Sequence, residues 1–187
     1  EDYIVRCYAM PAKFGSVAKA YVTQDDQLQS TPNALTITPN PLALNLYTLA
    51  YDQNKNFVAL NDALGRNLRE YLSLHRMLTD AINIKTPYIV NLGIEFEIIP
   101  RPDANSGETI LRCINYLKTT LSNDRMQINQ ALVVSHYMAE LDKIEGVQSV
   151  TSFKFTNKFD TTQGYAGNVY DIDGATKNNI IYPPVDP

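Results

Sequence analysis

The sequence has few of the side chains that form metal and redox sites: its 187 residues include two cysteines and two histidines. Cys7 and Cys113 each lie in an apolar helical pattern without the paired spacing of a zinc or redox motif, so we expect buried free thiols. We expect His75 to pack along an apolar helix stripe and His136 to be exposed after a helix cap. Neither histidine has a partner four residues away, so the sequence predicts no metal and no cofactor.

The sequence also lacks a basic excess and a long apolar run. Sixteen Lys and Arg stand against twenty Asp and Glu, and the basic residues are scattered, which does not favour a nucleic-acid partner. The apolar runs are far shorter than the roughly 18 to 20 residues needed to cross a bilayer, and no basic-then-apolar leader opens the chain. We expect a soluble protein with no membrane partner. Because the chain begins Glu1-Asp2-Tyr3, we also expect it to be a fragment of a longer protein.

Motifs for nucleotide binding and nucleophilic catalysis are missing: there is no phosphate-binding glycine loop and no Gly-x-Ser-x-Gly segment. Glu95 and Glu97 project from the same side of an expected strand, but alternation requires a polar face there, so we interpret them as solvated or partner-facing. The segment 171–174, Asp-Ile-Asp-Gly, begins like a calcium loop but lacks the closing Glu, so we interpret it as a turn. We predict no catalytic residue and a protein that is not an enzyme.

The strongest secondary-structure signal is the segment 89–99, in which apolar and polar side chains alternate as in a half-buried strand. One face carries Val90, Leu92, Ile94, Phe96 and Ile98. Capping residues predict the starts of three helices, at Asn61 or Asp62, at Asn105 with Glu108, and at Ser135. The other expected elements are a helix at 2–10, strands at 16–23, 42–51 and 147–156, and an exposed loop at 24–41. The apolar stripes of two helices are predicted at Leu64, Leu68, Tyr71, Leu72, His75 and Leu78, and at Ile110, Cys113, Ile114, Leu117 and Leu121.

This order of elements predicts an α+β fold with small mixed or antiparallel sheets covered by helices, in split β-α-β, ferredoxin-like units, and an extended C-terminal tail. We expect an N-terminal lobe at 1–86 that contains the loop 24–41, and a C-terminal lobe at 87–156. The tail, 157–187, is too thinly apolar to fold alone, so it must pack on its own domain or on a neighbour. A small hairpin around Asp173-Gly174 is compatible with its sequence.

Twelve tyrosines and no tryptophan distinguish the aromatic composition. Three of the tyrosines lie in the tail, where an amphipathic ring suits a protein–protein contact, although they could equally cover their own domain. Because we expect the apolar residues of this otherwise polar segment to be exposed, we predict a subunit contact formed by Tyr165, Tyr170, Ile180, Ile181 and Tyr182. Open sheet edges would offer a second route to assembly, by strand addition from another subunit.

Three segments have the look of a known family. They are the turn and strand from Pro11 to Val22, which contain Gly-Ser-Val-Ala-Lys-Ala-Tyr-Val, the Pro-Tyr-Ile-Val-Asn-Leu strand at 87–92, and the helix end Ile-Glu-Gly-Val-Gln-Ser-Val at 144–150. Together these segments resemble the phage baseplate J-like family. The general family pattern does not test the loop 24–41 or the tail from Asn157.

This resemblance implies a structural, non-enzymatic wedge subunit of a contractile-tail baseplate, located in the virion and assembled in the host cytoplasm. It implies association with itself, as a homodimer and within a ring, and with other wedge and hub proteins. The residues alone leave another class open, a ferredoxin-like module that binds a small molecule on its sheet or between its helices.

Overall fold

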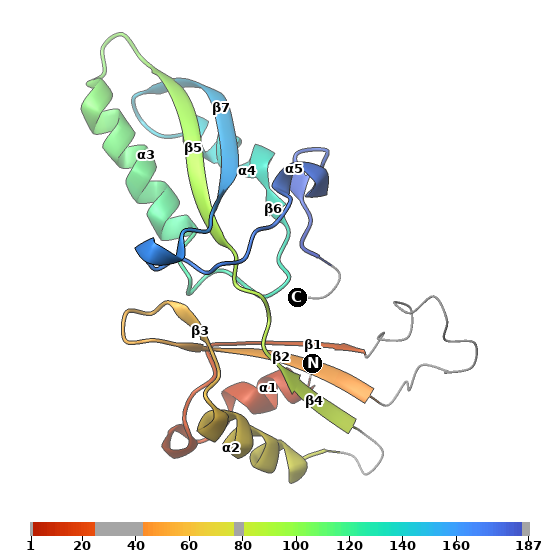
Figure 1. Ribbon diagram of the computed structural model, residues 1–187. Helices are drawn as coiled ribbons and strands as arrows, with labels where there is room; N and C mark the ends of the chain where they lie inside the picture. The colour runs from red at the N-terminus through yellow and green to blue at the C-terminus, as the bar shows by residue number, and fades with distance from the viewer. Residues whose placement is uncertain (1, 25–42, 77–80, 185–187) are drawn as a thin grey trace, which may run out of the picture. The chain divides into compact units, whose positions relative to one another are not determined.

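The computed structural model describes residues 2–24, 43–76 and 81–184 (Figure 1). The chain divides into two compact units between Pro87 and Tyr88, close to the boundary that the sequence suggests. Helices and small sheets are combined in both units, which confirms the predicted α+β class. All but the first residue of the expected loop 24–41 lies outside the described residues. No helix of the described segments is long and apolar enough to cross a membrane.

The sheet of unit 1 is organised around β2. Its strands are β1 (Lys19–Gln24), β2 (Ala43–Tyr51), β3 (Phe57–Ala59) and β4 (Ala81–Lys85). On one edge, β2 pairs antiparallel with β1. Because Leu49 pairs with Lys19 of β1 and also with Ala59 of β3, β3 must lie on the opposite edge, which β2 shares with the parallel strand β4. The strand β2 is therefore paired along both edges.

Two α-helices pack against this sheet: α1 (Asp2–Tyr8), followed by the 3-10 turn η1 (Ala12–Phe14), and α2 (Asp62–Ser73). As predicted, Asn61 caps α2, its side-chain oxygen accepting a hydrogen bond from the Leu64 amide at 2.7 Å. The predicted stripe Leu64, Leu68 and Leu72 is buried and packs with residues of α1 and β2. The sequence thus predicts this helix and its buried face correctly.

Other expectations for unit 1 are wrong. The strands β3 and β4 were not predicted, because each is short and β4 is recognisable only through its pairing with β2. His75 lies beyond the end of α2 and is exposed, not packed in the core; its ring contacts Tyr71 edge-on at 5.0 Å between centroids. Leu78 lies outside the described residues.

In unit 2, two long antiparallel strands carry two helices on one face (Figure 1). The elements are β5 (Asn91–Pro100), α3 (Ser106–Thr120), α4 (Val134–Asp142) and β7 (Val147–Lys158). Phe153 and Phe155 project from β7 into one cluster with Cys113 of α3 and with Tyr137 and Leu141 of α4. The alternation predicted for 89–99 is seen in part: Ile94, Phe96 and Ile98 pack on this cluster, whereas Leu92 is exposed.

The tail folds onto unit 2. It contains the 3-10 turn η2 (Thr161–Gln163), α5 (Ile172–Ala175), β8 (Thr176–Lys177) and β9 (Ile180–Ile181), and β9 lies between β8 and β6 (Leu132–Val133) in a small antiparallel sheet. Ile172 and Ile181 enter the unit 2 core. Of the two expected environments for the tail, the structure shows the first, packing on its own domain.

Several local expectations in unit 2 need correction. Ser135 does not cap α4, because the helix already begins at Val134. Ile110 is largely exposed, since the buried stripe of α3 is turned toward Thr109, Cys113 and Leu117. Asp173-Gly174 lies in α5, and the hairpin forms instead between β8 and β9, where Asn178 and Asn179 adopt positive φ. The prediction that both cysteines are buried and free is confirmed, and His136 is exposed in the first turn of α4 as expected.

Candidate interaction surface

Two of the five predicted contact residues, Tyr170 and Tyr182, are joined by a hydrogen bond within the tail. The Tyr170 hydroxyl donates to the backbone carbonyl of Tyr182 at 2.6 Å. Asn157 on β7 brackets the backbone of Tyr170, its amide donating to the Tyr170 carbonyl at 2.6 Å and its oxygen accepting from the Tyr170 amide at 3.3 Å. Tyr170 is half-buried and packs on the unit 2 core. Tyr170 therefore mainly holds the tail against β7.

The two predicted isoleucines differ from the expectation of exposed apolar residues. Ile181 is buried, with 7% of its surface exposed, and Ile180 is half-buried. The reason is their place in β9, which is paired on both edges, Ile181 with Leu132 and with Thr176. The expected exposure of Ile181 is wrong, because its side chain completes the core of its own unit.

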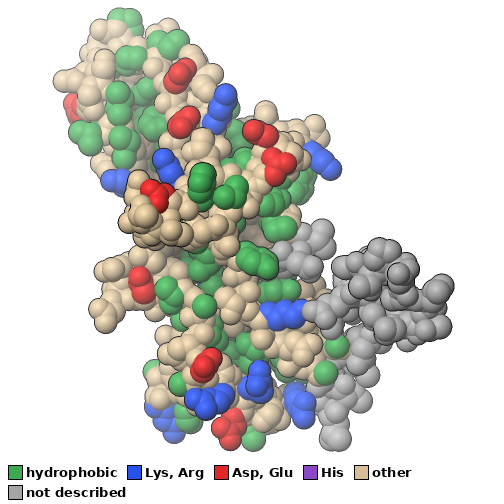
Figure 2. Space-filling model, viewed as in Figure 1, with side chains coloured by type: hydrophobic (Ala, Val, Ile, Leu, Met, Phe, Trp, Pro, Cys, Tyr) green, Lys and Arg blue, Asp and Glu red, His purple; other side chains and the backbone are tan. Residues whose placement is uncertain are grey.

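Tyr165 and Tyr182 remain exposed, with 36% and 47% of their surfaces accessible. Phe159 and Val169, in the same part of the chain, are more exposed still, and neither was among the predicted contact residues. We use the name tail surface for the four exposed side chains of this part of the chain, Phe159, Tyr165, Val169 and Tyr182, which share their exposure. Figure 2 shows that hydrophobic side chains reach the surface between scattered charges on the face in view. Exposed aromatic and aliphatic side chains of this kind suit a protein–protein contact.

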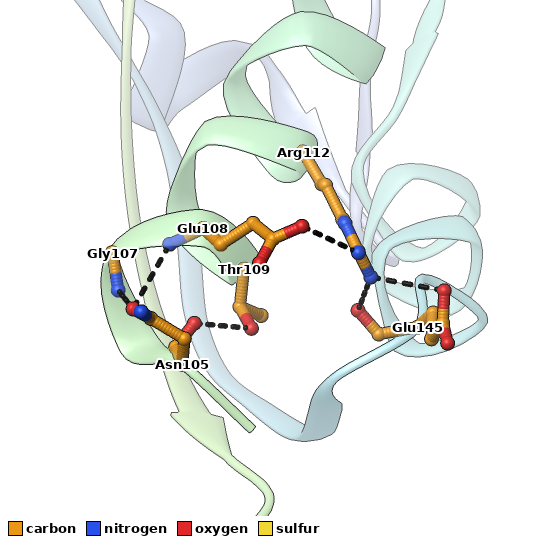
Figure 3. A network of polar contacts seen from close by, with 6 residues as sticks. All are labelled: Asn105, Gly107, Glu108, Thr109, Arg112 and Glu145. Atoms are coloured by element: carbon orange, nitrogen blue, oxygen red, sulfur yellow. Dashed lines mark hydrogen bonds and ion pairs between the residues drawn. The ribbon is translucent and has the colours of Figure 1, made fainter.

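A polar network fixes the start of α3 to the turn between α4 and β7 (Figure 3). The Asn105 side chain accepts hydrogen bonds from the amides of Gly107 and Glu108, as the predicted cap requires. Glu108 does not return a bond to Asn105 in a capping box; it pairs with Arg112 at 2.7 Å, and Arg112 also pairs with Glu145 at 3.0 Å. Because all three charged groups are substantially exposed, the network orients α3 more than it stabilises the fold.

The outer face of the β5–β7 sheet is polar. Glu95 and Glu97 of β5 are exposed, as expected for a solvated or partner-facing surface. Glu95 lies opposite Lys154 of β7, and Glu97 lies opposite Ser152. These side chains line an open groove of about 420 Å³. Acidic groups are therefore gathered on β5 and a basic group lies beside them on β7.

The described residues offer little reactive chemistry. They include no group of three His, Cys, Asp or Glu side chains that could hold a metal ion. Burial raises the pKa of the Cys7 thiol to about 11 and also raises the pKa of Cys113. A thiol with a raised pKa is a poor nucleophile at neutral pH, so both cysteines are core residues.

Comparison with known proteins shows a likeness to a solved structure. No family model and no curated protein matches the sequence. Among solved structures, the protein is similar to a chain in the six-fold symmetrised cryo-EM structure of the anti-feeding prophage (AFP) baseplate, with a TM-score of 0.55 and 13% sequence identity. The match covers 84% of this protein and 32% of the baseplate chain, so the protein spans about a third of that chain's length. The likeness shows a shared, baseplate-like fold.

Proposed function

We propose that the protein is a structural component of a contractile phage-tail baseplate, without enzymatic activity. In this proposal it is a wedge subunit of the virion tail, assembled in the host cytoplasm, that associates with itself and binds other wedge and hub proteins. Its work is to hold the baseplate together and to transmit rearrangement during tail contraction. Within the family that the sequence resembles, the counterpart that we propose is the C-terminal part of the T-even phage wedge subunit, gene product six.

The observation that carries this proposal is the fold likeness to a chain of the AFP baseplate. It extends over 84% of the protein, so it draws on both units and not on a single common motif. A shared fold does not by itself establish a shared function. Independent support comes from the family resemblance of the segments 11–22, 87–92 and 144–150, of which the last follows α4 and contains the start of β7.

The tail surface supplies the proposed contact for self-association. Tyr165 and Tyr182 expose amphipathic rings, and Phe159 and Val169 expose apolar side chains. Tyr170 and Asn157 hold this part of the chain against β7, so the exposed residues are presented from an ordered segment and lose little entropy on binding. Tyr170 and Ile181 contribute to the contact indirectly, by fixing the segment.

The direct test of the proposed function is the location of the protein in particles. Contractile-tail particles would be purified from cells that carry the gene and labelled with a gold-conjugated antibody raised against the protein. We expect gold at the baseplate end of the tail and loss of labelling when the antibody is first absorbed with the protein. Intact particles whose purified proteins do not include this chain would refute the proposal.

A further inference from the structure

One edge of β5 is open. Within the described residues β5 pairs only with β7, and alternate residues of an antiparallel strand direct their N–H and C=O groups away from the partner. Apart from bonds to β7, no described residue hydrogen-bonds to the backbone between Leu92 and Ile99. The N-terminal end of this open stretch of β5 is set by the segment after β7, where the Ala166 amide donates a hydrogen bond to the Asn91 side chain at 2.7 Å. The open window accommodates a strand of about eight residues, roughly 26 Å long.

The outer edge of β7 differs from that of β5 because it is protected. Two residues of β7, Gln148 and Thr151, have no partner on β5, so the strand is bulged at two places. The Val150 amide is already satisfied by the Asp142 carboxylate of α4 at 2.8 Å. Bulges are one of the means by which proteins prevent strands from adding to a sheet edge. No residue of β5 is bulged, and none of its amides between Leu92 and Ile99 is bonded to a described element other than β7, which makes it the edge better suited to receive a strand.

The side of α3 that faces away from α4 is apolar. On this helix Arg112 bonds to Glu145 beside α4, whereas Ile110 and Ile114 project from the other flank of the buried stripe. Ile110 and Leu111 are exposed by 43% and 58%, and Ile114 is half-buried without joining the core. Figure 1 shows α3 on the side of β5 that is away from β7. A strand added to β5 would therefore lie over this apolar flank.

The charges on β5 define the outward side chains that such a strand should carry. Residues adjacent to Glu95 and Glu97 on an added strand would lie within cross-strand reach of both carboxylates, which favours Lys or Arg there. A second copy of β5 is a poor occupant, because antiparallel pairing of two β5 strands gathers four glutamates on one face. The fitting occupant is a partner segment that alternates apolar and basic residues.

We propose that the β5 edge binds an extended segment of a partner protein by strand addition, with apolar residues packed on the Ile110 flank of α3 and Lys or Arg beside Glu95 and Glu97. The inference rests on the geometry of unit 2 and goes beyond the baseplate assignment. Backbone hydrogen bonds supply the affinity in this mode of recognition, and the alternating side chains supply the specificity.

The test uses labelled eight-residue peptides and the whole protein. Fluorescence anisotropy would compare a peptide of alternating Val and Lys with one of alternating Val and Glu, and with a Val-Lys peptide that is N-methylated at alternate residues. We expect saturable binding of the Val-Lys peptide, weaker binding by roughly tenfold for the Val-Glu peptide, and no binding after N-methylation. Hydrogen exchange should slow at residues 92–99 when the Val-Lys peptide binds.

A pair of variants separates this site from general electrostatic attraction. Glu95→Lys combined with Glu97→Lys should reverse the preference in favour of the Val-Glu peptide. The control, Glu70→Lys combined with Asp173→Lys, changes the net charge equally at exposed positions that are not part of β5 and should leave the preference intact. Circular dichroism would verify that each variant folds. The proposal would be overturned if the N-methylated peptide bound as tightly as the unmodified one, if hydrogen exchange slowed only outside residues 92–99, or if no peptide bound saturably. None of these results would bear on where the protein is located in particles, which tests the proposed function separately.

Discussion

The two units use their sheets differently. In unit 1 the strand β2 is paired along both edges, by β1 on one side and by β3 and β4 on the other. In unit 2 the two long strands pair with each other and with no further strand among the described residues. A two-stranded sheet is marginal by itself, so unit 2 depends on its helices and on aromatic packing, such as the Phe153–Phe155 contact at 5.2 Å between ring centroids. Unit 2 therefore combines a core formed largely by helices and aromatic side chains with a β5 edge to which no other described strand is paired.

The largest expected effect comes from removing one buried leucine in each unit. Leu68 in α2 and Leu141 in α4 are both fully buried. Leu68→Ala and Leu141→Ala should each lower the free energy of unfolding by about 2 to 5 kcal/mol, through lost apolar burial and the cavity that remains. The rate of amide hydrogen exchange should rise mainly in the unit that carries the substitution. Equal acceleration in both units would show that they do not unfold separately.

Two glycines should give opposite results. Gly146 has φ of 93°, and an added Cβ would lie 2.5 Å from the Thr109 hydroxyl, so Gly146→Ala should destabilise unit 2 by about 1 to 3 kcal/mol. Gly65 lies within α2, and an added Cβ there meets no atom within 4 Å. Gly65→Ala should therefore stabilise unit 1 by roughly 0.5 to 1 kcal/mol. Chemical denaturation measures both, and a destabilised Gly65→Ala would contradict the open surroundings of that position.

Two buried threonines sharpen the comparison further. The Thr48 hydroxyl in β2 has no hydrogen-bond partner within the described structure, whereas the Thr109 hydroxyl donates to the Asn105 carbonyl at 3.0 Å. Thr48→Val should raise the free energy of unfolding by about 1 kcal/mol, and Thr109→Val should lower it by about 1 kcal/mol. Denaturation midpoints measure the difference. If Thr48→Val lowered the free energy of unfolding, the Thr48 hydroxyl would have to have a hydrogen-bond partner in the folded protein.

The smallest effect is a pH dependence in two exposed turns. The Asp52 carboxylate accepts hydrogen bonds from the amides of Asn56 and Asn54, at 2.8 and 2.7 Å, and the Asn56 bond contributes most to lowering its pKa. In unit 2, the Thr162 hydroxyl and amide lower the pKa of Asp160 in the same way. A lowered folded-state pKa means that each turn is fully stabilised above the ordinary Asp value of about 3.9 and loses this support as the pH falls through the lowered value.

Nuclear magnetic resonance can follow these turns through the amide shifts of Asn54, Asn56 and Thr162 between neutral and acidic pH. We expect both midpoints below the ordinary Asp value. Asp52→Asn should abolish the first transition and leave the second unchanged. A midpoint for Asp52 at or above the ordinary value would contradict the observed hydrogen bonds.

The sequence predicted those parts of the fold that local chemistry determines. Asn61 and Asn105 mark helix starts because their side chains satisfy amides a few residues away. Alternation at 94–98 identified β5 because one face is buried. In contrast, β4 depends on pairing with β2, which lies far from it in the sequence.

The candidate contact was less predictable, because burial depends on which neighbours a side chain meets. Two residues that are adjacent in the sequence have opposite environments: Ile181, at the end of β9, is buried, whereas Tyr182, which follows it, is exposed. On α3 the apolar residues form a stripe wider than the core can cover, and composition does not show that Cys113 is buried while Ile110 is exposed. The open edge of β5 could be recognised only from the strand pairing in the structure, because the sequence does not show which strands lack a second neighbour.

The most direct test of the account is the molar mass of the whole protein in solution, measured by light scattering coupled to size exclusion over a wide concentration range. The account predicts a mass that rises above the monomer value of 21.0 kDa with concentration. It also predicts that Tyr165→Ser combined with Tyr182→Ser shifts this rise to higher concentration, whereas the exposed control Leu74→Ser in unit 1 does not. A mass of 21.0 kDa at every concentration would contradict self-association.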